Sequence, residues 1–296
     1  MSDKLSGLWP AMFTPVDDEG NPALDELAKL ADLLIGQGLD GLYILGSTGQ
    51  GVLFTETQRK SVTEQVMQVN AGRVPVMVQV GAMTTDESVR LATHAATAGA
   101  NAVSSVGPIY FTGNTTTALA HYRQIATATD LPFFPYQLGS NTMGDIGNFI
   151  TRLLDIPNVA GMKLTTGQLM EISTIHLHAG ERLRLFSGAD ELFCQASLCG
   201  TVGAIGTFYN LWGETCKQVL EAFQQGDYSQ AKEFMLEFQR IILFVLPNIW
   251  TFLRKAMDMK YGIDIGRTKA PLGTMQQEWG DAEVRTILDR MEIFDI

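Results

Sequence analysis

The feature of this sequence that most restricts its fold is a unit that recurs about eight times: a short apolar run, a glycine-containing or polar loop, and an amphipathic segment. Regular alternation of strand and helix predicts a parallel sheet whose crossover connections are right-handed. Continuous apolar runs such as VMVQV predict strands that are buried on both faces. The runs expected to form strands cover residues 7–13, 41–46, 74–81, 101–106, 131–137, 158–164, 182–188 and 201–207.

The number of these units favours one closed architecture. Eight strands in a chain of 296 residues predict an α/β fold of the (β/α)8 TIM-barrel type, and not an open doubly wound sheet. The run 131–137 fits least well, because Pro132 and Pro135 cannot donate to a strand ladder. We expect the barrel to occupy residues 1–210, and additional C-terminal helices in residues 211–296 to complete it and pack on it.

Charge and composition limit the partners. A formal net charge of −11 and a pI near 4.8 argue against nucleic acid or an anionic membrane as the main partner. The longest apolar stretch, residues 241–253, is too short to span a bilayer and is broken by Pro247, so a buried helix pair is expected. No secretory leader is evident, and three cysteines without metal-like spacing suit a cytoplasmic protein. No metal site is predicted.

Lys163 is the most unusual residue, because it interrupts an apolar strand where active sites of such barrels lie, at the C-terminal strand ends. Burial disfavours the ammonium form and favours a nucleophilic amine that can condense with a ketone as a Schiff base. The alternative is a lysine that simply emerges at a strand end. Tyr136 ends the preceding strand and could carry protons beside the imine, or it could merely pack its ring at the rim.

The loop GSTGQG, residues 46–51, follows another apolar run. It lacks the Gly-Lys-Ser/Thr ending of a Walker loop and the glycine order of a dinucleotide loop, so phosphate is not the expected ligand. Ser47 and Thr48 offer two hydroxyls and two consecutive N–H groups, which suit a small carboxylate. An ordinary glycine-rich turn remains the alternative.

Two adjacent acids, Asp190 and Glu191, follow the seventh strand. They could merely favour a helix N-terminus. Their use in a binding site would be to accept hydrogen bonds from a polyhydroxylated substrate.

These residues, in this order and over nearly the whole chain from FTPVDDEG (13–20), resemble the pyruvate-dependent class I aldolase family that contains N-acetylneuraminate lyase and dihydrodipicolinate synthase. The resemblance implies a (β/α)8 barrel with extra C-terminal helices, a homotetramer, and no cofactor beyond a covalent Schiff base between Lys163 and the substrate. It also implies roles for five further residues. Tyr136 would relay protons, Ser47 and Thr48 would hold the pyruvate carboxylate, the main chain of Ile205 would face pyruvate, and Tyr110 would enter the adjacent protomer's site.

Within that family the motifs GSTG, KLTTGQL, GADELF and GAIGTFYN look like the lyase branch. The residues that would then contact the sugar-derived part of the substrate are Thr165, Gly188, Asp190, Glu191 and Thr207. The synthase branch carries an arginine shortly after the tyrosine, whereas residues 136–144 here read YQLGSNTMG. Gln50 and Gln137 replace the familiar glutamate and asparagine, and the usual proline is missing at Gly139.

The predicted protein is a lyase that reversibly cleaves a sialic acid or related 2-keto sugar acid to pyruvate and an aldose or amido sugar. The first alternative is a dihydrodipicolinate synthase that joins pyruvate to aspartate semialdehyde. The alternative of another class is a non-catalytic barrel that binds a keto acid or a sugar.

Overall fold

The computed structural model describes residues 5–111, 114–139 and 144–294. Eight parallel strands form one sheet in the order β1-β8-β7-β6-β5-β4-β3-β2. The strands are β1 (Gly7–Pro10), β2 (Leu42–Ile44), β3 (Val76–Gln79), β4 (Ala102–Val106), β5 (Phe133–Leu138), β6 (Gly161–Thr165), β7 (Arg184–Ser187) and β8 (Thr201–Gly206). A parallel bridge between Ala11 and Tyr43 joins the first edge to the last, so the sheet closes as the predicted (β/α)8 barrel.

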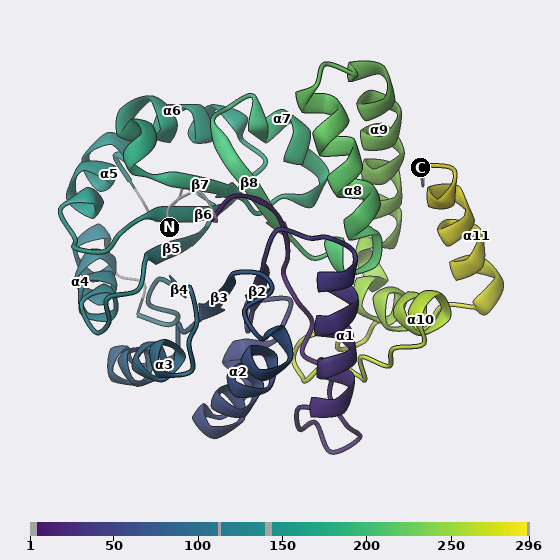
Figure 1. Ribbon diagram of the computed structural model, residues 1–296, viewed down its shortest axis with the longest axis horizontal. Coiled ribbons are helices and arrows are strands. Elements are labelled where there is room, and N and C mark those ends of the chain that lie inside the picture. The colour runs from purple at the N-terminus through teal and green to yellow at the C-terminus, as the bar shows by residue number, and fades with distance from the viewer. Residues whose placement is uncertain (1–4, 112–113, 140–143, 295–296) are drawn as a thin grey trace.

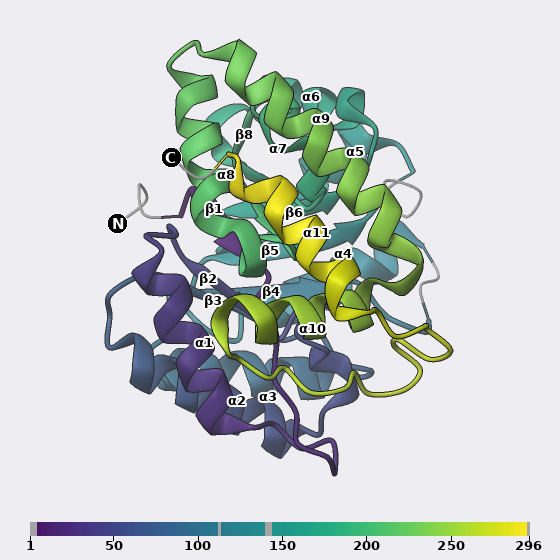
Figure 2. The same cartoon turned by 90° about the vertical axis from the view of Figure 1, so that its right-hand side faces the viewer.

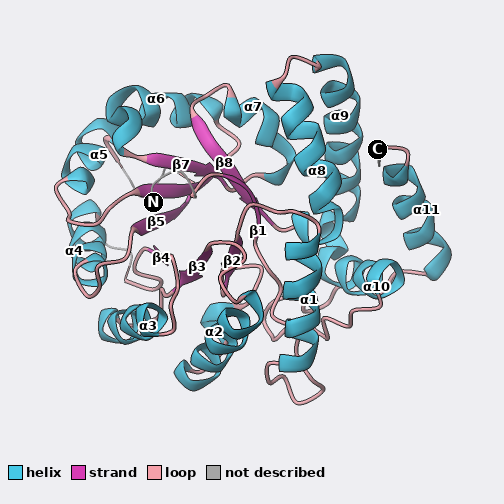
Figure 3. Cartoon of the chain, viewed as in Figure 1, coloured by secondary structure: helices cyan, strands magenta, loops and turns pink. Residues whose placement is uncertain are grey.

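Helices surround the strands on the outside, and Figures 1 and 3 show both layers. Those that follow the strands are α1 (Leu24–Gly36), α2 (Glu56–Asn70), α3 (Thr85–Thr97), α4 (Thr115–Ala126), α5 (Ile146–Leu154), α6 (Leu169–Ala179), α7 (Phe193–Ser197) and α8 (Tyr209–Gln224). Local signals explain where several begin. Thr55 and Gln58 form the complete capping box expected before α2, and the Thr84 hydroxyl accepts the Glu87 N–H at the start of α3.

Three more helices follow: α9 (Tyr228–Val245), α10 (Ile249–Tyr261) and α11 (Asp281–Glu292). The first two pack on α8, and α11 packs on α9 and α10 (Figure 2). The stretch Tyr228–Tyr261 is long and apolar enough, by length and composition, to cross a membrane. The 3-10 turn Leu246–Asn248 breaks it into α9 and α10, and both helices bury apolar side chains such as Phe238 and Phe252. The expected helix pair is therefore present.

The side-chain period of two in each strand divides the core into an inner and an outer part. The inner cluster takes one residue in two, such as Trp9, Tyr43, Phe134 and Phe186, and their strand neighbours join the larger cluster beneath the helices. The run with two prolines does form β5, in register with β4. Only Pro135 lies within the strand, so a single backbone N–H is missing from its hydrogen-bond ladder. This alternation decides which side chains enter the barrel.

Candidate active site

Lys163 enters the barrel interior. Its neighbours on β6, Met162 and Leu164, belong to the outer cluster, so Lys163 points to the opposite face of the strand. Only 4% of the residue is exposed. The alternative of a lysine that emerges into solvent at a strand end is therefore wrong.

Tyr136 is the register partner of Lys163 on the adjacent strand β5. The Lys163 Nζ atom lies 4.4 Å from the centre of the Tyr136 ring, and the tyrosine is also only 4% exposed. Burial by itself would raise the pKa of the phenol. The Lys163 charge and the hydrogen bond with Ser47 outweigh burial, and the pKa of Tyr136 falls below its ordinary value. The phenol is thus better able to exchange a proton than an ordinary tyrosine.

The GSTGQG loop brings its hydroxyls to the same place. Ser47 Oγ lies 3.5 Å from the Tyr136 hydroxyl, and Thr48 Oγ1 lies 2.7 Å from Thr207 Oγ1. Glycine is required at position 51, because a Cβ atom there would lie 1.9 Å from the Leu45 carbonyl oxygen. The loop is therefore folded tightly on itself beside the lysine, as a carboxylate site would need.

The ends of β6 and β7 meet above Lys163. A Cβ atom on Gly188 would lie 2.0 Å from Thr165 Oγ1 and 3.1 Å from Lys163 Cε. Any side chain at position 188 would displace Thr165 and crowd the lysine. Glycine here keeps open the space next to the Lys163 side chain.

Asp190 is buried, with 7% of the residue exposed. Its Oδ2 atom accepts the Phe208 backbone N–H at 2.6 Å. Burial raises the pKa of the Asp190 carboxyl to about 7, although the Phe208 N–H and the Lys163 charge act in the opposite direction. One oxygen of the predicted sugar acceptor is therefore already engaged in the fold.

Three other predicted residues lie at different depths. Glu191 is half-buried, and its backbone carbonyl accepts a hydrogen bond from Gln239 Nε2. Ile205 is fully buried in the inner cluster, in register with Trp9 on β1. Tyr110 is 76% exposed and its ring contacts Phe111, so the single chain does not bring Tyr110 into the buried group around Lys163.

A cavity of about 320 Å³ opens beside Ser47 and Tyr136. The Gln137 side chain that replaces the familiar asparagine lines this cavity and donates a hydrogen bond to the Tyr122 hydroxyl at 2.8 Å. The rest of the lining is mainly apolar: Gly46, Val52, Gln79, Val106, Gly107, Pro108, Ile109, Ala118 and Leu138. Residues 140–143, within the stretch that lacks the synthase arginine, lie outside the described residues.

Two contacts were missed by sequence reasoning. Tyr43 lies inside the barrel next to Lys163, and a polar aromatic residue within the apolar run GLYIL was the available signal. Gln50 Oε1 accepts the backbone N–H of Lys269, 219 residues away, and no local pattern predicts such a contact.

Among the described residues, no three His, Cys, Asp or Glu side chains are grouped as a metal site would require.

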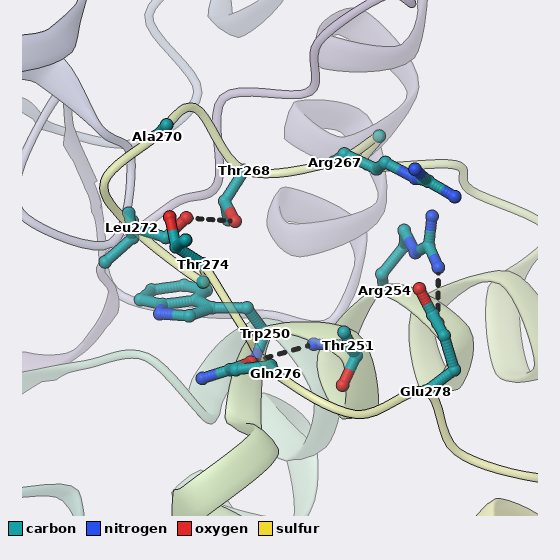
Figure 4. A pocket seen from close by; sticks show the side chains of 12 residues that line it. Trp250, Thr251, Arg254, Arg267, Thr268, Ala270, Leu272, Thr274, Gln276 and Glu278 are labelled. Atoms are coloured by element: carbon teal, nitrogen blue, oxygen red, sulfur yellow. Dashed lines mark hydrogen bonds and ion pairs between the residues drawn. The ribbon is translucent and has the colours of Figure 1, made fainter.

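A second cavity, of about 220 Å³, lies between α10 and the loop that precedes α11 (Figure 4). Arg254 is ion-paired with Glu278 at 2.6 Å, and Gln276 Oε1 accepts the Trp250 backbone N–H at 2.9 Å. None of the predicted site residues lines this cavity.

Comparison with known proteins agrees with this geometry. Residues 4–290 match the model of the Dihydrodipicolinate synthetase family. The N-acetylneuraminate lyase of Citrobacter koseri is 30% identical over 286 residues, which are 94% of this chain and 95% of that protein. The enzyme of the same name from Salmonella typhimurium is 29% identical over the same shares.

Solved structures extend the likeness to three dimensions. The N-acetylneuraminate lyase of Mycoplasma synoviae superimposes with a TM-score of 0.87 at 25% identity and covers 98% of both chains. The sialic acid aldolase of Ruminococcus gnavus gives a TM-score of 0.91 at 24% identity over 99% of this chain and 98% of that chain, which supports the fold. The barrel, its buried lysine and the match over almost the full length lead to one conclusion: the chain belongs to the dihydrodipicolinate synthetase family.

Proposed function

We propose that this protein is a carbon–carbon lyase that cleaves a sialic acid or related 2-keto sugar acid to pyruvate and an aldose or amido sugar. The observation that carries the proposal is the position of Lys163, buried inside the barrel between Tyr136 and the GSTGQG loop. An amine held in this way can form a Schiff base, and the adjacent hydroxyls can bind a carboxylate and move a proton.

The reaction follows from the chemistry of an imine. The Lys163 amine attacks the C2 ketone of the open-chain substrate, and loss of water gives a protonated Schiff base. Tyr136 accepts the proton of the C4 hydroxyl and passes its own phenol proton through the Ser47 hydroxyl to solvent. The C3–C4 bond breaks, and its electron pair moves to the iminium, which becomes a neutral enamine. The aldehyde leaves, the enamine is protonated at C3, and hydrolysis returns pyruvate and the free amine.

The two ends of the substrate would be held by different residues. Ser47 and Thr48 would bind the carboxylate next to the imine, with the main chain of Ile205 facing the pyruvate part. Thr165, Gly188, Asp190, Glu191 and Thr207 would surround the sugar-derived part. The names of the relatives favour a sialic acid over aspartate semialdehyde as the substrate.

A second copy of the chain would complete the site. Tyr110 and Phe111 are both about three-quarters exposed and stack edge to face at the rim of the barrel. Burial of this pair against a second protomer would remove apolar surface from water and could bring Tyr110 to the partner's Ser47–Tyr136 pair. We propose a cytoplasmic homotetramer, as the family resemblance implies, and light scattering of the purified protein would test its size.

Reductive trapping tests the central step. Purified protein is treated with sodium borohydride, with pyruvate present or absent, and the adduct is located by peptide mass mapping. We expect a pyruvate-dependent adduct on the peptide that contains Lys163. Its absence would refute the Schiff-base lyase and leave the binding barrel as the better interpretation.

Substrate assays separate the two enzymes. The protein is tested for cleavage of N-acetylneuraminate and for condensation of pyruvate with aspartate semialdehyde. We expect turnover of the first. Turnover of the second alone would identify a synthase, although the Lys163 adduct would form in both cases.

A further inference from the structure

Tyr43 lies in the middle of β2 and has no role in the reaction as described above. It is fully buried and belongs to the inner cluster, so its ring enters the barrel from the side opposite β6 in the strand order. Three contacts of this ring bear on the candidate site: with Lys163, with Tyr136 and with Gly46.

The first contact is with the reacting nitrogen. Lys163 Nζ lies 4.5 Å from the centre of the Tyr43 ring and 4.4 Å from the centre of the Tyr136 ring. The two rings are nearly perpendicular, at 86°, with their centres 6.3 Å apart. The nitrogen therefore lies over two aromatic faces, each of which carries the partial negative charge that attracts a cation.

The Tyr43 hydroxyl is engaged elsewhere. It lies 3.2 Å from Ser104 Oγ on β4. Burial raises the pKa of the Tyr43 phenol far above its ordinary value, with the Tyr136 charge acting in the same direction. Tyr43 therefore remains neutral at physiological pH, and its ring, not its hydroxyl, is the part available to the lysine.

The contact with Gly46 concerns the loop that would hold the carboxylate. A Cβ atom on Gly46 would lie 2.5 Å from Tyr43 Cε1. The first residue of the GSTGQG loop thus packs closely against the Tyr43 ring, and glycine at position 46 allows this approach. The same ring supports both the lysine and the residue that precedes Ser47.

We infer that Tyr43 is a further residue of the reaction, whose ring, together with that of Tyr136, stabilises the cationic Schiff base on Lys163 and fixes the direction of its nitrogen. The inference rests on the proposed function, because it assigns a partner to the same iminium. The two rings attract a positively charged nitrogen, whether it is the Lys163 ammonium or the iminium, and attract the neutral amine only weakly. They therefore favour the iminium over the neutral amine that attacks the ketone.

The test compares substitutions at Tyr43 with a matched substitution at another aromatic residue inside the barrel. Tyr43→Leu and Tyr43→Met remove the aromatic face, and Tyr43→Phe keeps it. Phe134→Leu removes a ring of the same inner cluster, one that packs edge to face on Phe186. For each variant we measure the initial rate of borohydride trapping with pyruvate, kcat and KM for N-acetylneuraminate, and the thermal unfolding midpoint.

We expect Tyr43→Leu and Tyr43→Met to trap pyruvate about 3- to 30-fold more slowly than Phe134→Leu, with a similar fall in kcat and a smaller change in KM. Tyr43→Phe should recover most of the rate. If the Leu variant does not fold, the Met variant, whose flexible chain fills more of the space, provides the comparison.

Two results would overturn the inference while the proposed function stands. In the first, Tyr43→Leu and Tyr43→Met are trapped with pyruvate as fast as Phe134→Leu. In the second, Tyr43→Phe is trapped as slowly as Tyr43→Leu, which would assign the effect to the hydroxyl. A wild-type protein that forms no adduct on Lys163 would instead refute the proposed function and this inference together.

Discussion

The cavity at the barrel mouth and the cavity of the C-terminal region differ in what their polar groups do. Beside the cavity at the barrel mouth, an amine, a phenol and a serine hydroxyl lie together, and the amine and phenol are almost completely buried. In the cavity of the C-terminal region, Arg254 is paired with Glu278, and the Gln276 amide caps the start of α10. The polar groups beside the barrel-mouth cavity can take part in a reaction, whereas those of the C-terminal cavity stabilise the local fold.

The difference arises from how each region is built. Lys163 and Tyr136 are fixed by the register of β5 and β6, and strands impose a direction on every second side chain. The C-terminal cavity is lined by a loop and a helix start, whose backbone groups need side-chain partners. The two regions are connected, because Gln50 of the GSTGQG loop accepts the N–H of Lys269 from the loop that lines the second cavity.

Removal of the amine should have the largest effect. We expect Lys163→Ala to abolish the pyruvate adduct and to lower turnover of N-acetylneuraminate by at least about 10⁴-fold, because Lys163 is the one buried lysine in the described part of the chain. Steady-state kinetics and mass mapping measure both changes. Lys29→Ala, at an exposed lysine of α1 paired with Glu26, serves as the control, and substantial turnover by Lys163→Ala would contradict the mechanism.

Removal of the phenol should have a smaller effect on the same site. Tyr136→Phe keeps the ring over Lys163 and loses the hydroxyl that lies 3.5 Å from Ser47 Oγ. We expect kcat for cleavage to fall by about 10²- to 10³-fold while the adduct still forms, because proton transfer is impaired and imine formation is not. If Tyr136→Phe also lost the adduct, the tyrosine would be needed to build the site and not only to move a proton.

The sequence predicted the barrel and the place of the lysine, because both follow from local periods. The alternation of strands and helices predicts the fold. Successive side chains of a strand point to opposite faces, which directs Lys163 inward once β6 is recognised. The contact of Thr48 with Thr207 and that of Tyr43 with Lys163 could not be predicted in this way. Each joins strands or loops that meet only when the barrel closes. A local pattern can single out a residue such as Tyr43, but it does not show which residue Tyr43 contacts.

The stability of the protein should depend on pH through the carboxyl group of Asp190 at the barrel mouth. Its carboxyl has a pKa of about 7 in the fold and an ordinary value of 3.8, so from about pH 4 to pH 7 the folded chain holds a proton that the unfolded chain has lost. The contribution of this group to stability therefore falls as pH rises through that window. Asn cannot ionise, but its amide oxygen can still accept the Phe208 N–H.

We expect Asp190→Asn to be more stable than the wild type by about 2 kcal/mol at pH 8, with the difference shrinking towards pH 4. Urea unfolding at several pH values measures the free energies. Asp281→Asn, at an exposed carboxylate paired with Lys255, is the control and should show no such gain at pH 8. A difference between Asp190→Asn and wild type that does not change with pH would mean that Asp190 is ionised throughout the range.

The smallest effects are expected in the C-terminal cavity. Arg254→Met removes an ion pair whose carboxylate side chain is 56% exposed, and pairs of this kind contribute about 0–1 kcal/mol. We expect turnover within about twofold of wild type and a change in unfolding free energy below about 1 kcal/mol. Lys255→Met, another cation of α10 with an exposed partner, is the matched control. A tenfold loss of turnover in Arg254→Met alone would mean that the loop reaching Lys269 transmits its position to Gln50 and the GSTGQG loop, so that the two cavities act as one site.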